Sequence, residues 1–119
     1  MEPKMPMELS APMRECIEDC QDCHNICIET LHYCLDKGGE HANPNHLSLM
    51  MDCVEMCQTS ADFMLRSSSL HSRTCSVCAE VCEMCAEDCS KFGGDEMMQE
   101  CAEVCRNCSD SCRKMAARM

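Results

Sequence analysis

Cysteine recurs at helical spacing along four segments of this 119-residue chain. Successive cysteines within a segment are three or four residues apart, except for one step of seven in which Thr30 occupies the missing place. Residues at these spacings lie on the same face of an α-helix, so each segment places its thiols on one narrow stripe. In a helical bundle that stripe is the buried seam, which is normally built of Leu, Ile and Val. We therefore expect a core made of thiols that is itself the functional site. The sixteen cysteines are Cys16, Cys20, Cys23, Cys27, Cys34, Cys53, Cys57, Cys75, Cys78, Cys82, Cys85, Cys89, Cys101, Cys105, Cys108 and Cys112.

The usual core-forming residues are scarce. Leu, Ile, Val and Phe together number 16, and with a net charge of −11 such a composition is typical of disorder. The 16 cysteines and 13 methionines supply the missing buried side chains, because both residue types pack readily in apolar surroundings. A chain of this length is expected to form one domain.

The acidic balance excludes several classes of function. Nucleic acids and anionic membrane surfaces both require Lys and Arg on the protein, so we expect neither as a partner. No segment reaches the ~20 apolar residues of a membrane span, and the first residues lack the apolar run of a secretory signal. We therefore expect a cytoplasmic protein with reduced thiols. The carboxylates between the cysteines should form a solvated face; examples are Glu18, Asp22, Glu55, Glu83 and Glu103.

Capping residues and glycine pairs divide the chain into four predicted helices. The expected N-caps are Ser10, Asn43, Ser69 and Asp95. Glycine pairs at 38–39 and 93–94 are expected to end the first and third helices. The predicted helices therefore span residues 12–37, 44–66, 70–92 and 96–117.

Long helices joined by short loops favour antiparallel neighbours. We predict an all-α fold, an antiparallel up-down-up-down four-helix bundle with a cysteine-lined core, formed by a single domain over residues 12–119. Residues 1–11 contain Pro3 and Pro6 and several methionines, and we expect them to form an irregular Met-rich N-terminal arm.

A line of neighbouring thiolates favours a soft, monovalent metal ion. Thiolates and thioethers select Cu(I), with Zn(II) and iron–sulfur clusters as competitors. Zinc prefers separate tetrahedral sets of four ligands, whereas along a continuous stripe each thiolate can bridge two Cu(I) ions. At about one ion per cysteine, Cu(I) replaces the thiol proton without adding buried charge, which divalent zinc would add. We predict a Cu(I) storage or buffering protein that binds multiple ions per chain and is not an enzyme.

Two alternatives stay open at this level. Residue types alone do not distinguish copper from zinc or another soft metal that such a protein could buffer. The even number of cysteines also permits a metal-free, disulfide-stabilised helical interaction module. Long helices in a reducing compartment do not need such cross-links, which disfavours the module.

Methionine and histidine extend the cysteine stripes toward the bundle ends. Thioether sulfur and imidazole nitrogen are further ligands for Cu(I). We expect four such residues to be copper ligands, namely Met50, Met98, His46 and His41. Ions should enter at the bundle end that carries Met50, Met98 and His46 and be passed inward from there.

The cysteine motifs resemble those of the bacterial copper storage proteins, in particular the cytosolic branch of that family. The resemblance covers about residues 13–115 and rests on CIEDCQDCHNIC at 16–27, CSVCAEVCEMCAEDC at 75–89 and CAEVCRNCSDSC at 101–112. It implies a four-helix bundle whose inward thiolates hold many Cu(I) ions, assembled as a homotetramer, with copper admitted at one end lined by His or Met. By position, that end holds His41, His46, Met50, Met97 and Met98. Residues 91–95 depart from the family pattern because they contain no histidine.

Overall fold

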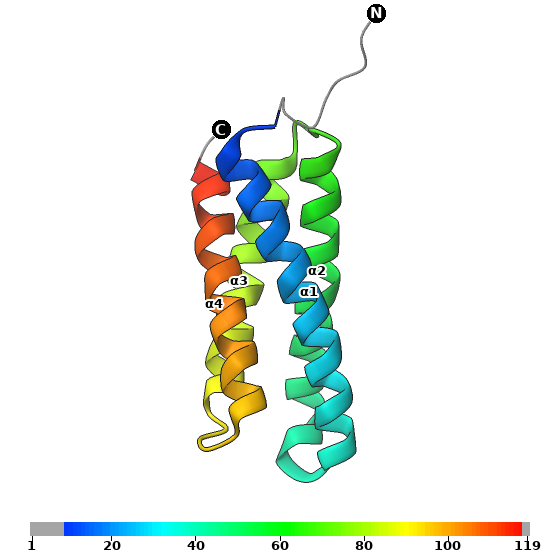
Figure 1. Cartoon of the computed structure of the whole chain (residues 1–119). Helices are drawn as coiled ribbons and strands as arrows, with labels where there is room; N and C mark the ends of the chain where they lie inside the picture. The colour runs from blue at the N-terminus through cyan, green and yellow to red at the C-terminus, as the bar shows by residue number, and fades with distance from the viewer. Residues whose placement is uncertain (1–8, 118–119) are drawn as a thin grey trace, which may run out of the picture.

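Four α-helices run alternately up and down the bundle in this computed structural model, which describes residues 9–117 (Figure 1). Their bounds are α1 Ala11–Lys37, α2 Pro44–Leu65, α3 His71–Ser90 and α4 Glu96–Ala117, with a short 3-10 helix, η2, at Gly39–Ala42. The predicted all-α, up-down-up-down bundle is confirmed. The predicted Met-rich arm falls mainly on residues 1–8, which lie outside the described residues.

The two ends of the bundle are built from different connections (Figure 1). Residues 38–43 and 91–95 join α1 to α2 and α3 to α4 at what we call the hairpin end. The α2–α3 turn, the start of α1 and the end of α4 lie at the opposite end, which we call the terminal end. Each helix therefore directs a buried stripe along the bundle axis; the stripe is rich in cysteine on α1, α3 and α4, whereas on α2 its two cysteines lie in the middle.

Three of the four predicted N-caps are present. In each, a side-chain oxygen accepts a hydrogen bond from a backbone N–H two or three residues later, which satisfies a donor that the first helical turn leaves free. The three pairs are Ser10 Oγ with Met13 N (3.2 Å), Asn43 Oδ1 with Asn45 N (2.9 Å) and Asp95 Oδ1 with Met98 N (3.2 Å).

The α2–α3 turn differs from the prediction, because Ser69 does not cap α3. α2 ends in a Schellman motif, in which Ser67 adopts a positive φ of 55° and Ser68 N–H donates to Phe63 O at 2.9 Å. Ser68 Oγ then accepts from Leu70 N–H at 3.1 Å, and α3 begins at His71 without a side-chain cap. Ser67 takes a conformation that glycine usually occupies, so the sequence gives little warning of this turn.

α3 is also shorter than predicted. It ends at Ser90, and Phe92 lies in the following turn instead of in the helix. Gly94 has a φ of +81°, which lets the chain reverse sharply into α4. As a result the Phe92 ring folds over the hairpin end, with its centroid 4.3 Å from the His41 ring and 5.1 Å from the His46 ring.

Thiols form most of the core. All sixteen cysteines have no exposed surface, and neither do Met50, Met64 and Met98. α3 and α4 each bury small residues, Ala79 and Ala86 on α3 and Ala102 and Ser109 on α4, which permits a close approach of the two helices. Ser109 Oγ donates to Ala79 O at 2.8 Å. The predicted stripe is therefore the buried seam.

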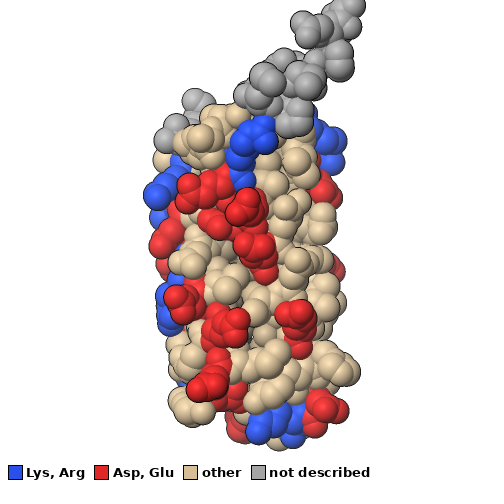
Figure 2. Space-filling view, in the orientation of Figure 1, with Lys and Arg blue, Asp and Glu red and all other residues tan. Residues whose placement is uncertain are grey.

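Charged side chains occupy the outer surface. Figure 2 shows Asp and Glu spread over the face that α1 and α4 present in this view, with few basic groups between them. The acidic residues predicted to form a solvated face are all exposed; they are Glu18, Asp22, Glu55, Glu83 and Glu103. Among the described helices, none combines the length and apolarity needed to cross a membrane.

Asp95 ties three elements together at the hairpin end. Besides capping α4, its carboxylate accepts from Tyr33 Oη of α1 at 2.8 Å and lies 2.9 Å from His41 Nε2 of η2. We predict that Asp95→Ala lowers the free energy of unfolding of the apo-protein by about 1–2 kcal/mol, measured by urea denaturation, because a cap and two further bonds are lost. Glu100→Ala, at an exposed position of α4, is the matched control and should change it by less than about 0.5 kcal/mol. Equal losses in both variants would contradict this role of Asp95.

Candidate metal centre

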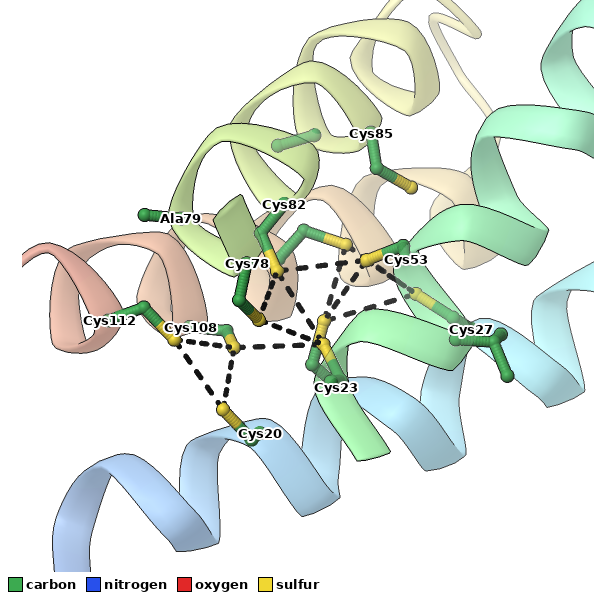
Figure 3. Close-up of a cluster of buried hydrophobic side chains, with 14 of the residues drawn as sticks. Cys20, Cys23, Cys27, Cys53, Cys78, Ala79, Cys82, Cys85, Cys108 and Cys112 are labelled. Atoms are coloured by element: carbon green, nitrogen blue, oxygen red, sulfur yellow. Dashed lines mark hydrogen bonds between the residues drawn. The ribbon is translucent and has the colours of Figure 1, made fainter. Parts of the chain in front are cut away.

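The thiols form a continuous column along the bundle axis, which we define as the cysteines other than Cys34. Figure 3 shows Cys20, Cys23 and Cys27 of α1 pointing toward sulfurs from the other three helices. Cys23 Sγ lies 3.7 Å from Cys53 Sγ of α2 and 3.7 Å from Cys105 Sγ of α4. The other pairs of sulfurs in contact along the central part of the column are 3.5–4.0 Å apart. Such spacing lets a small ion bind two sulfurs after a slight shift of either side chain.

Groups of sulfurs that could share one ion overlap along the column. In each group the Sγ atoms lie within 4.8 Å of one another. The groups are Cys20, Cys78, Cys108 and Cys112; Cys57, Cys78, Cys82 and Cys108; Cys23, Cys53, Cys57 and Cys82; Cys23, Cys27, Cys53 and Cys105; and the trio Cys16, Cys75 and Cys112. Because each group shares members with the next, they cannot all be closed tetrahedral sites at once. Simultaneous occupation requires sulfurs that bridge.

All sixteen cysteines are free thiols in the structure. Hydrogen bonds between them shift their acidity in opposite directions. The pKa of Cys53 is lowered, because Cys105 and Cys23 hydrogen-bond to its sulfur. The pKa of Cys105 is raised by its hydrogen bonds to Cys101 and Cys23. The thiols therefore share their protons, and ionisation of one changes the acidity of its neighbours.

Cys34 stands apart from the column at the hairpin end. Its sulfur lies 3.3 Å from His46 Nε2 and 3.6 Å from Met98 Sδ. On the inner side, Thr30 of α1 and Met50 of α2 fill stripe positions, and both are fully buried. Three chemically different ligand atoms, from α1, α2 and α4, thus meet at one place outside the thiol column.

The predicted hairpin-end residues divide into an inner and an outer set. Met50, Met98 and His46 are buried, as the prediction of an inward-facing site requires. His41 has an 18% exposed side chain and turns its Nε2 toward Asp95, so the structure does not bring it to the thiols. The Phe92 ring packs against both imidazole rings.

Asp88 is a polar neighbour of this site that the sequence reasoning missed. Its Oδ2 lies 2.5 Å from His46 Nδ1. Asp88 belongs to α3 and His46 to α2, 42 residues apart, so no local spacing connects them. The only available signal was that Asp88 directly precedes Cys89 and therefore flanks the buried stripe.

The terminal end carries soft ligand atoms as well. Met64 and Met115 are buried there, next to the layer of Cys16, Cys75 and Cys112. Cys75 Sγ lies 3.4 Å from Ser60 Oγ. Ser60 is the stripe position at which α2 changes from thiols to other side chains, so the thiol column ends here.

The fold and the site together define a class of protein: a helical bundle whose core is a continuous set of ligands for soft metal ions. A family model described as copper storage protein matches residues 9–117, and the chain belongs to this family.

Solved structures agree with this assignment. A protein of Nitrosospira multiformis is 43% identical, with a TM-score of 0.86 and coverage of 91% of this chain and 97% of that chain. The Cu(I)-bound copper storage protein BsCsp3 is 31% identical, with a TM-score of 0.82 and coverage of 88% and 98%. The Streptomyces lividans copper storage protein Ccsp, loaded with 10 copper equivalents, is 26% identical, with a TM-score of 0.81 and coverage of 98% and 95%. No curated protein matches the chain.

Burial makes the apo-protein sensitive to alkali. Loss of hydration raises the pKa of the Cys34 thiol from 9.0 to about 11. Below pH 9 the thiol is protonated in both the folded and the unfolded chain; between pH 9 and 11 the unfolded chain ionises first, so stability falls as pH rises. We predict a falling urea midpoint for reduced apo-protein above pH 9, with a smaller fall in Cys34→Ser. A midpoint that stays constant or rises over this range would contradict the prediction.

Proposed function

We propose that this protein stores or buffers Cu(I) in the cytoplasm, with the sixteen cysteines as its ligands. The overlap of the thiol groups is the observation that carries the proposal. Bridging thiolates suit Cu(I), which thiolate ligands select and which forms sites of low coordination number. One monovalent ion for each thiol proton also keeps the buried column neutral. The Cu(I)-bound and copper-loaded relatives support the same function.

Zinc fits the column less well. Closed four-thiolate sites require separate quartets, but Cys23, Cys53, Cys57 and Cys82 each belong to two of the groups of four. Filling one group removes ligands from the next. The column would therefore hold few zinc ions for its number of cysteines.

Copper is proposed to load through the hairpin end. Cys34, His46 and Met98 offer a thiol, an imidazole and a thioether there, and Met50 lies one layer further in. A cavity of about 410 Å³ reaches His46 from outside. His41 is an outer residue of the same end, and its role as a copper ligand remains a prediction.

The protein is proposed to act by binding alone, without catalysis, and to form a homo-oligomer, a tetramer by family resemblance. Under this proposal the protein binds copper ions and other copies of itself, and it binds neither nucleic acid nor membranes. One similar structure is that of a cytosolic copper storage protein from Streptomyces lividans, which supports a cytoplasmic location for this protein. Exposed apolar side chains on α1, Ile28 at 46% and Leu35 at 57%, offer surface for contact between copies.

Titration of reduced apo-protein with Cu(I) against a competing chelator tests the storage role. We predict binding of about 16 ions per chain, because each bridging thiolate corresponds to one ion. Cys82→Ser and Cys105→Ser should both reduce the capacity. Saturation at four ions or fewer would contradict storage, and unchanged metal content in both variants would favour a metal-free interaction module. Elemental analysis after growth with copper and zinc separates the two metals.

Replacing ligands at one end tests the direction of loading. We predict that combined His46→Leu, Met50→Leu and Met98→Leu slows Cu(I) uptake in stopped-flow experiments by about 10-fold while capacity stays nearly unchanged. The control is Met64→Leu with Met115→Leu, which removes thioethers from the terminal end and should leave the rate unchanged. If the control slowed uptake equally, loading through the hairpin end would be wrong. If capacity fell and the rate did not, the three residues would be storage ligands.

A further inference from the structure

His46 is held from two sides in a defined orientation. Its side chain is 5% exposed, with Nδ1 2.5 Å from Asp88 Oδ2 and Nε2 3.3 Å from Cys34 Sγ. The Phe92 ring packs against the imidazole at a centroid distance of 5.1 Å and an interplanar angle of 51°. The ring therefore has little freedom to rotate.

The two contacts of the imidazole determine where its proton lies. An ionised carboxylate only accepts hydrogen bonds, so Nδ1 carries the proton and donates it to Asp88. In the neutral ring Nε2 then keeps its lone pair, and it faces the Cys34 thiol. This lone pair is the part of the side chain that binds a metal ion.

The surroundings of Asp88 keep this arrangement nearly neutral. Lys91 Nζ lies 3.9 Å from Asp88 Oδ1 and partly balances the carboxylate. A Cu(I) ion bound to Cys34 replaces the thiol proton, which leaves to solvent, so thiolate and ion cancel. His46 and Met98 add neutral ligand atoms. No net charge is buried when an ion occupies this place.

We propose that Asp88 is the positioning residue of a copper transfer site formed by Cys34, His46 and Met98. By accepting the Nδ1 proton, it selects the tautomer of the neutral ring that leaves the lone pair on Nε2, and it holds that atom toward Cys34, so an arriving ion meets a prepared ligand. Metal-binding histidines depend on such hydrogen-bonded partners, and removal of the partner costs 10–100-fold in affinity or activity. The inference rests on the proposed copper function but concerns the rate of transfer, whereas capacity depends on the thiol column.

The test compares three variants with the wild type. Asp88→Ala removes the hydrogen-bond acceptor. Asp88→Asn keeps an amide oxygen that can still accept from Nδ1. Glu87→Ala removes the same charge one residue away, at an exposed position of α3, and is the matched control. Asp88→Leu, which also lacks an acceptor, replaces the alanine variant if circular dichroism shows that the latter does not fold.

Two readouts are used. Nitrogen-15 NMR of the reduced apo-protein reports which nitrogen of His46 carries the proton, and stopped-flow uptake from a Cu(I) chelate reports transfer. We expect the Nδ1–H form in the wild type, in Glu87→Ala and largely in Asp88→Asn, and loss of this preference in Asp88→Ala. Uptake should slow about 10-fold in Asp88→Ala and about twofold or less in the other two, with capacity unchanged throughout.

Three results would overturn the proposal. One is a wild-type His46 protonated on Nε2. The second is an Asp88→Ala protein with unaltered proton position or unaltered uptake. The third is an equal slowing by Glu87→Ala, which would mean that the carboxylate acts only through its charge. A wild type that takes up few copper ions would instead refute storage, and the NMR result on apo-protein would still decide the position of the proton.

Discussion

A core of buried thiols is stable only while each sulfur carries a proton or an equivalent positive charge. All sixteen cysteines are fully buried, and an uncompensated thiolate in such surroundings is strongly disfavoured. A column of protonated thiols satisfies this condition in the apo-protein. Cu(I) satisfies it equally, because a monovalent ion replaces a proton at constant charge. The same backbone can therefore hold the empty and the filled column.

The backbone does not rely on the column alone to keep its shape. Thiols make a less cohesive core than Leu or Ile, so stability must come partly from the frame around them. Side-chain caps start three helices, a Schellman motif ends α2, and Asp95 fastens α1, η2 and α4 at the hairpin end. Such ties hold the four helices whose sulfurs contact one another at 3.5–4.0 Å. The frame around the column thus helps to set the spacing of its ligands.

The helical stripe could be predicted because it depends only on spacings of three and four along the chain. The bundle and its thiol core follow from that pattern and from three correct caps. The hairpin-end site could not be derived in the same way, since its parts come from different helices. Asp88 meets His46 only after α2 and α3 have packed, and His41 is drawn outward by Asp95. The α2–α3 turn was mispredicted because Ser67 takes the positive φ usually reserved for glycine.

The column also implies a direction of movement for copper. At the hairpin end, ligands are one thiol with a neutral imidazole and a neutral thioether, whereas further in each ion can have thiolates alone. Under the proposed function, a Cu(I) ion gains stability as it moves inward, because anionic sulfurs replace neutral ligand atoms. When Cu(I) leaves, the thiolate that held it must take up a proton, because an unpaired negative charge in the buried core is strongly disfavoured. Release is therefore coupled to proton uptake. The cavity of about 410 Å³ beside His46 and Asp88 connects solvent to the site where both exchanges begin.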